Sequence, residues 1–160
     1  MLNEFQVKRV WENMLAAETR ALYFGDLTSR STRLKQWIVG LSFLTSSSAA
    51  ASIIAKLPNW LPLILAFLGA AATAYSMAVN LDARVATMAK LHAAWGQIAT
   101  RYDRLWNHTA DADAEQQLDA IMQMEKEPSE LAATDAPNNQ KLMEKWQNRV
   151  FALYHLPTQA

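Results

Sequence analysis

Cysteine is absent from the 160-residue chain, and its absence excludes two kinds of chemistry. Without cysteine the protein has no disulfide framework, no thiolate nucleophile and no cysteine metal site. Acidic and basic residues are equal in number, so the formal net charge is zero and does not favour a nucleic-acid partner. What remains informative is how the charges are distributed along the chain.

Charge is almost absent from the middle of the sequence. Between residues 36 and 81 the only Asp, Glu, Lys or Arg is Lys56, and residues 1–35 and 82–160 carry all the others. A helix in water needs polar side chains on its outward face, and this segment offers few. We therefore expect it to lie in lipid. A hairpin buried in a soluble helical bundle is the alternative, which the short flanking segments disfavour.

Two uncharged runs lie within this segment, at residues 37–55 and 60–81. A helix rises about 1.5 Å per residue and needs roughly 20 residues to cross the hydrocarbon layer. Between the runs, Pro58 follows Lys56 and predicts a tight turn. The sequence thus predicts an all-α integral membrane protein with a hairpin of two transmembrane helices.

Basic residues near the ends of the two runs predict the orientation of the hairpin. They are Arg30, Arg33 and Lys35 before the first run and Arg84 after the second. The intervening turn carries Lys56 alone. Because lysine and arginine accumulate on the cytoplasmic side of a membrane, both termini are expected to be cytoplasmic.

The expected organisation has three parts. Residues 1–35 form a cytosolic amphipathic helix and a basic bridge, residues 36–81 the hairpin, and residues 82–160 a cytosolic helical region. The first helix of that last region is expected to continue the second span without interruption to Trp106, because no proline separates them. Gly25 and the polar stretch at residues 28–32 predict a weakening or bend of the first helix before the hairpin.

Apolar residues recur at steps of three and four in both arms, which predicts one buried face on each helix. In residues 4–24 these are Val7, Val10, Met14, Ala17, Ala21 and Phe24. After the hairpin they are Met88, Leu91, Trp95, Ile98, Tyr102 and Leu105. We expect this second stripe to pack on the amino-terminal arm or on a neighbouring subunit of a homo-oligomer.

Two shorter helices are expected after the stripe. Asp111 or Asp113 can cap one that ends near Glu127, and Asn138 can cap the last, after a linker at residues 134–138. The cytosolic part is therefore expected to be entirely helical.

The sequence shows no catalytic constellation. It has no glycine-rich phosphate loop and no His-Glu metal pair at helical spacing. His92, His108 and His155 stand apart and are interpreted as packing or surface residues. We therefore expect no enzymatic activity, no cofactor and no metal.

Small and polar residues form one face on each predicted span. They are Ser42, Thr45 and Ser52 on the first, and Gly69, Thr73, Ser76 and Asn80 on the second. Such faces allow helices to approach closely and to hydrogen-bond within a membrane. They either hold the hairpin or an oligomer together or, in an oligomer of several copies, line a hydrated path for ions. The sequence favours the packing role, and the pore-lining role is the alternative.

The order of these segments resembles that of the SLATT family of bacterial two-transmembrane effectors. The resemblance rests on the amphipathic segment FQVKRVWENMLAAETRALYFGD, the bridge RSTRLKQW, the small-residue-rich first span, the short hairpin and the long segment LHAAWGQIATRYDRLW. It implies an effector of a bacterial defence or conflict system that acts at the inner membrane. It also implies a nucleotide-signalling partner or sensor, since the chain itself has no nucleotide-binding motif.

The leading functional hypothesis is therefore a membrane effector that oligomerises and permeabilises the bacterial inner membrane. The alternative is a passive membrane anchor or scaffold whose helical arms recruit a cytosolic partner. Membrane lipid is the expected environment in both cases.

Overall fold

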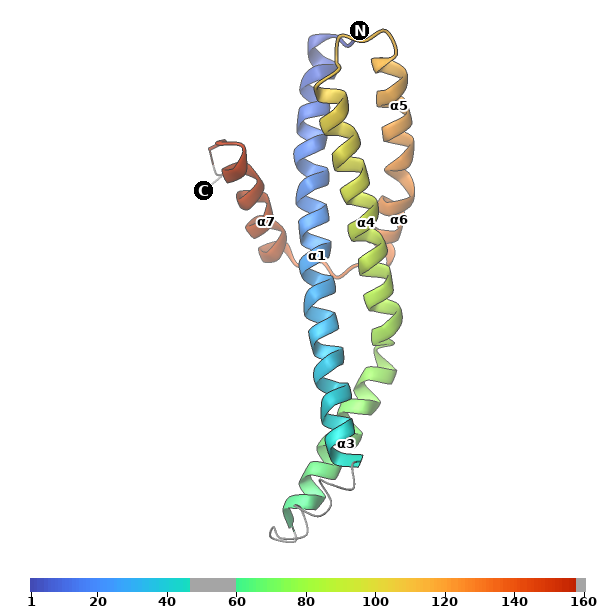
Figure 1. The fold of residues 1–160 in the computed structure, drawn as a ribbon, viewed down its shortest axis with the longest axis vertical. Helices are drawn as coiled ribbons and strands as arrows, with labels where there is room; N and C mark the ends of the chain where they lie inside the picture. The colour runs from blue at the N-terminus through green and yellow to red at the C-terminus, as the bar shows by residue number, and fades with distance from the viewer. Residues whose placement is uncertain (47–59, 158–160) are drawn as a thin grey trace. The chain divides into compact units, whose positions relative to one another are not determined.

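The structure is a computed structural model that describes residues 1–46 and 60–157, and these residues are helical with no β-strand among them. The all-α prediction is thus confirmed for this part of the chain. The helices are α1 (Glu4–Ser46), α3 (Trp60–Ala78), α4 (Leu81–Trp106), α5 (Ala114–Met124), α6 (Lys126–Asp135) and α7 (Gln140–Leu153) (Figure 1).

The chain divides into two compact units. Unit 1 comprises Met1–Thr28 and Thr87–Ala160, and unit 2 comprises Ser29–Ala86. The two cytosolic arms expected from the sequence therefore fold together into one unit, although 58 residues of unit 2 separate them in the chain. The unit boundaries lie a few residues away from the predicted divisions at 35/36 and 81/82.

Unit 1 is a helical bundle. The first part of α1 and α4 run antiparallel side by side, α5 and α6 follow α4, and α7 lies beside α1 (Figure 1). Their apolar faces meet in one core. On α1 it comprises Val10, Met14, Ala17, Ala21 and Phe24, on α5 Leu118 and Ile121, and on α7 Leu142 and Val150. The backbone N–H of Leu2 donates to the Thr109 carbonyl at 3.0 Å and closes the bundle at the N-terminus of α1.

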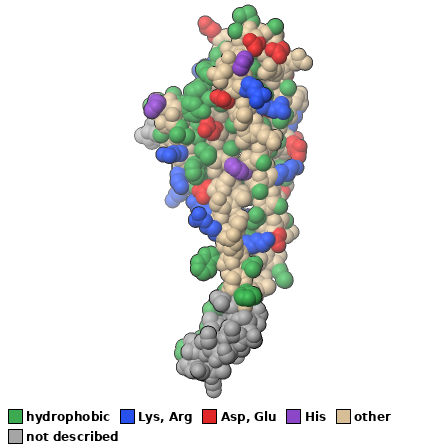
Figure 2. Space-filling model, in the orientation of Figure 1, with side chains coloured by type: hydrophobic (Ala, Val, Ile, Leu, Met, Phe, Trp, Pro, Cys, Tyr) green, Lys and Arg blue, Asp and Glu red, His purple; other side chains and the backbone are tan. Residues whose placement is uncertain are grey.

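On the face that Figure 2 shows, the bundle carries both acidic and basic side chains among hydrophobic ones. This mixture matches the zero net charge of the sequence and is typical of a surface in water.

Helix α1 continues where a weakening was predicted. It passes without interruption through Gly25 and the polar stretch at residues 28–32. The hydroxyl of Thr28 donates to the Phe24 carbonyl four residues earlier, at 2.8 Å, so this polar side chain bonds within the helix instead of competing with it. Gly25 has a tertiary role described below. The predicted weakening therefore does not break the helix.

The predicted continuous helix from residue 60 to Trp106 is also wrong, because it is interrupted at Val79 and Asn80. Helix α3 ends at Ala78 and α4 begins at Leu81. Asn80 has φ 45°, a left-handed conformation that asparagine tolerates better than most residues do. Its N–H bonds to the Met77 carbonyl at 3.1 Å, which closes the turn. The sequence signal for this break was the asparagine within an otherwise apolar run.

The carboxyl-terminal helices differ from expectation in detail. Helix α5 ends at Met124 rather than near Glu127, and α6 follows directly. The last helix is capped by Asn139 and not by Asn138: its Oδ1 accepts from the Leu142 N–H at 3.1 Å. Asp113 is the N-cap residue of α5, although its side chain makes no capping bond.

Candidate functional site

Two hydroxyl groups meet inside unit 2. The Oγ of Ser42 on α1 lies 3.2 Å from the Oγ1 of Thr73 on α3, and Thr73 also donates to the Gly69 carbonyl at 2.9 Å. Gly69 is buried and Thr73 is half-buried. The small, polar face of α3 is therefore turned toward α1, where a small residue lets the two helices approach.

Other members of the predicted polar faces are placed differently. Ser76 is half-buried on the same helix as Thr73. Asn80 lies in the turn after α3 and is exposed, so it does not extend the helical face as predicted. The side chain of Thr45 and all of Ser52 lie outside the described residues. Among the members of the set that the structure describes, it brings together Ser42 and Thr73, with Gly69 one turn before Thr73 on α3.

Large apolar side chains cover the outside of unit 2. On α1, Trp37 is 78% exposed and Phe43 is 71% exposed; on α3, Phe67 is 72% exposed. Met77 on α3 is exposed to the same degree, and five more side chains are about half exposed: Val39, Trp60, Ile64, Leu68 and Tyr75. This arrangement is the reverse of unit 1, where the apolar side chains face inward. An apolar surface of this kind marks contact with lipid or with another protein.

The basic residues that set the predicted topology lie at one end of unit 2. Lys35 Nζ pairs with Asp82 Oδ1 at 2.5 Å, which joins α1 to the first turn of α4. Arg30 and Arg33 are exposed, and Arg84 is half-buried. An exposed ion pair contributes about 0–1 kcal/mol, so this contact adds little to the stability of unit 2. Sequence reasoning missed Asp82 as the partner of Lys35.

The predicted spans map onto the structure only in part. The first, 37–55, begins within α1 and extends into residues 47–59, which lie outside the described part. The second, 60–81, corresponds to α3 with the turn that follows. Among the helices formed by residues 1–46 and 60–157, none has both the length and the apolar character needed to cross a membrane.

The stripe on α4 is buried within unit 1. Met88, Leu91, Trp95, Ile98, Tyr102 and Leu105 are each at most 1% exposed. Their partners lie on α1, α5 and α7 of the same chain. Of the two arrangements expected from the sequence, packing on the amino-terminal arm is therefore the one observed.

Tyr102 is the polar member of this stripe. Its hydroxyl accepts from Asn13 Nδ2 at 3.2 Å. Burial, reinforced by the nearby Glu125 carboxylate, raises the pKa of Tyr102 to about 12. The phenol is therefore a neutral, hydrogen-bonded part of the core near neutral pH and has no role as a base.

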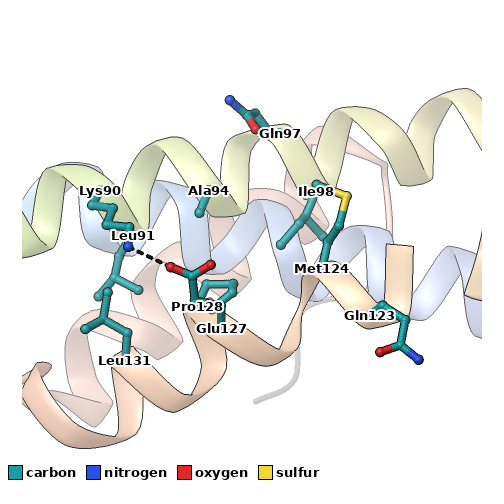
Figure 3. A pocket seen from close by; sticks show the side chains of 10 residues that line it. All are labelled: Lys90, Leu91, Ala94, Gln97, Ile98, Gln123, Met124, Glu127, Pro128 and Leu131. Carbon is teal, nitrogen blue, oxygen red and sulfur yellow. Dashed lines mark hydrogen bonds and ion pairs between the residues drawn. The ribbon is translucent and has the colours of Figure 1, made fainter. Parts of the chain in front are cut away.

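A cavity of about 250 Å³ lies between α4 and the α5–α6 segment (Figure 3). Its wall is mostly apolar, with Leu91, Ile98 and Leu131 among the lining residues. At its edge, Lys90 Nζ pairs with Glu127 Oε1 at 2.7 Å, and this hydrogen bond lowers the pKa of the Glu127 carboxyl. Because the two charges satisfy each other, the cavity offers no unmatched charge for a ligand.

The histidines serve packing and helix ends. His92 Nδ1 lies 2.8 Å from the Ala21 carbonyl, and its ring lies over Gly25, where a Cβ would come within 3.1 Å of it. His108 Nδ1 lies 2.8 Å from the Arg104 carbonyl. Within the described residues, no three His, Cys, Asp or Glu side chains gather as metal ligands.

No protein family model, curated protein or solved structure matches the chain. The SLATT resemblance therefore stays a prediction, and the functional argument depends on the residues and contacts described above.

Proposed function

We propose that unit 2 inserts into a lipid bilayer as a helical hairpin and anchors unit 1, a folded helical bundle, at the membrane surface. The observation that carries the proposal is the outward-facing apolar surface of unit 2, with Trp37, Phe43 and Phe67 more than two-thirds exposed. This surface belongs to a stretch in which Lys56 is the only charged residue between 36 and 81.

The energetic reason is burial of apolar surface. Moving a large apolar side chain out of water stabilises by about 1.5–3 kcal/mol. Several such side chains together give on the order of 10 kcal/mol for transfer into lipid. The hydroxyls of Ser42 and Thr73 face each other inside the hairpin, so insertion does not leave these polar groups against hydrocarbon.

The proposed orientation has unit 1 on the cytoplasmic side of a bacterial inner membrane. In the sequence, Arg30 and Arg33 precede the two predicted spans and Arg84 follows them, whereas the segment between the spans carries Lys56 alone. This distribution supports cytoplasmic termini by the bias of basic residues toward that side. Introduced cysteines at Thr134 and at Asn59 test the orientation, since only Asn59→Cys should react with an impermeant maleimide added outside intact cells.

Flotation with liposomes tests insertion directly. The purified chain should float with lipid vesicles, and the double substitution Phe43→Glu with Phe67→Glu should leave most of it in the dense fraction. The matched control is Phe5→Glu, because Phe5 is 75% exposed but belongs to unit 1. If all three proteins float equally, or if the unaltered chain forms a soluble dimer that ignores vesicles, the proposed insertion is wrong.

A permeabilising effector is the second candidate function. This function requires several copies whose hairpins open, so that the Ser42 and Thr73 hydroxyls turn from each other toward a shared hydrated path. A homo-oligomer and a separate sensor or nucleotide-signalling partner belong to this proposal. The buried stripe on α4 weighs against it, since those six residues are unable to join subunits unless unit 1 opens.

A measurement of membrane potential distinguishes the anchor from the permeabilising effector. Cells producing the chain should keep their potential if unit 2 is only an anchor, and a potentiometric dye should report depolarisation if it forms a pore. The paired change Ser42→Ala with Thr73→Val should reverse a depolarisation that runs through the hydroxyl face. A potential that stays normal at high expression supports the anchor.

A further inference from the structure

Unit 2 is the basic part of a chain whose charges balance overall. The whole sequence carries 15 basic and 15 acidic residues. Within Ser29–Ala86, however, five residues are basic and one is acidic. The basic residues are Arg30, Arg33, Lys35, Lys56 and Arg84, and the acidic one is Asp82. The unit with the exposed apolar surface is therefore also the unit that an anionic surface attracts.

Two arginines of unit 2 lie at the same level and have no acidic partner. The Lys35–Asp82 ion pair and the hydroxyl contact described above join earlier residues of α1 to later residues of the returning chain, so the two arms of unit 2 run antiparallel. The second residue before Lys35 and the second residue after Asp82 are therefore level with each other. These residues are Arg33 and Arg84. Within the described parts of the chain neither forms an ion pair, so their charges are unmatched.

The exposed side chains of α1 in unit 2 follow the order of the layers at a membrane surface. Arg33 and Trp37 are four residues apart, so they share one face of the helix, with Trp37 about 6 Å further along. Trp37 is 78% exposed, and the exposed Phe43 follows it. A charged group, an amphipathic ring and an apolar side chain thus succeed one another, as headgroups, interface and hydrocarbon do in a bilayer.

We infer that Arg33 and Arg84 contact the headgroups of anionic phospholipids, so that unit 2 prefers these lipids to zwitterionic ones. The inference rests on the proposed insertion of unit 2 into a bilayer. Because the two arginines are level with each other, both meet the same leaflet. A zwitterionic headgroup has no net charge to offer them, whereas an anionic one does. Each basic residue close to an anionic leaflet strengthens the attraction about fivefold.

Brominated lipids measure this preference in the full chain. Bromines on acyl chains quench tryptophans that contact lipid, and unit 2 contains the exposed Trp37 and Trp60. The variant Trp60→Phe leaves Trp37, which lies one helical turn from Arg33, as the reporter in unit 2. This variant is reconstituted in phosphatidylcholine vesicles with a fixed share of brominated phosphatidylcholine or brominated phosphatidylglycerol. The relative binding constant of the anionic lipid should be about five times that of the zwitterionic one, or more.

Two double substitutions in the Trp60→Phe background identify the residues responsible. Arg33→Gln with Arg84→Gln should bring the two binding constants to equality while quenching by brominated phosphatidylcholine persists. Arg101→Gln with Arg104→Gln should leave the preference intact, because these exposed arginines belong to unit 1.

The outcomes separate this inference from the insertion on which it rests. If both brominated lipids quench Trp37 equally before the arginines are changed, unit 2 is in lipid but the inferred preference is wrong. The inference is also overturned if the two double substitutions lower the preference alike. Absence of quenching by either lipid overturns the insertion of unit 2, and the inference with it.

Discussion

Unit 1 and unit 2 are both helical, yet they place their apolar side chains in opposite ways. In unit 1 the stripes of α1 and α4 point at each other, and residues such as Leu91 are completely buried. In unit 2 large apolar side chains such as Phe43 and Phe67 point outward, and the small or hydroxyl-bearing residues lie between the helices. The same secondary structure thus presents its apolar side chains inward in one unit and outward in the other, and the proposed insertion of unit 2 into lipid depends on this contrast.

The largest effect is expected from truncating a buried side chain in the core of unit 1. Leu91→Ala should lower the free energy of unfolding by about 2–5 kcal/mol, since the side chain is fully buried and leaves a cavity. Urea unfolding of the detergent-solubilised chain, followed by tryptophan fluorescence, measures it. Leu68→Ala and Leu153→Ala are the controls, because these side chains are about half exposed. Equal losses for all three leucines would remove the contrast between the units.

The second-largest effect is expected at alkaline pH, which should lower the free energy of unfolding of unit 1. The pKa of Tyr102 is raised to about 12, above its usual 10, so the folded state favours the neutral phenol. Its contribution to stability is therefore fully present below pH 10 and is lost as the pH rises toward 12. A shift of this size corresponds to about 2–3 kcal/mol. The difference in absorbance at 295 nm between the unaltered chain and Tyr102→Phe should show this tyrosine titrating near pH 12, and a midpoint near 10 contradicts its burial.

Loss of the Tyr23 hydroxyl should loosen α7 from the bundle. Tyr23→Phe leaves the Pro137 carbonyl and the Asn139 N–H without their partner, at a cost of about 1–3 kcal/mol. Hydrogen exchange should quicken in α7 and its linker before it does in α4. Tyr75→Phe is the matched control because Tyr75 is exposed in unit 2. Unchanged exchange in α7 would mean that its apolar contacts alone hold it.

The smallest effect is expected at Gly25. Alanine in a helix interior is favoured over glycine by about 0.5–1 kcal/mol, but a Cβ here meets the His92 ring at 3.1 Å. Gly25→Ala should therefore show its full stabilising effect only in a His92→Ala background. A double-mutant cycle by thermal unfolding measures the coupling, and additive effects would show that the ring moves aside freely.

Repeated spacing predicted the helical faces well. The three-and-four rhythm found the stripe from Met88 to Leu105 and its counterpart on α1, since packing of helices depends on that period. It did not decide between an intramolecular and an intermolecular partner, because one sequence carries no information on which copy supplies the facing stripe. The arrangement of α1 and α4 within one unit had to come from the structure.

Local interruptions were predicted less well. Gly25 and the polar residues after it predicted a weakening, yet α1 runs through them without a break. The His92 ring packs against Gly25 and the Thr28 hydroxyl bonds within the helix, and local propensity contains neither contact. Asn80 was counted as a member of a polar helical face, although its tolerance of positive φ makes it the residue that ends α3.

The environment of unit 2 is the central claim, and site-directed spin labelling tests it most directly. Since the chain has no cysteine, single cysteines at Phe43, Phe67 and Phe5 give unique labelling sites. In the liposome-reconstituted chain, labels at Phe43 and Phe67 should be accessible to oxygen and protected from a water-soluble nickel chelate, with the opposite result at Phe5. Free access of the nickel chelate to all three positions would contradict the account.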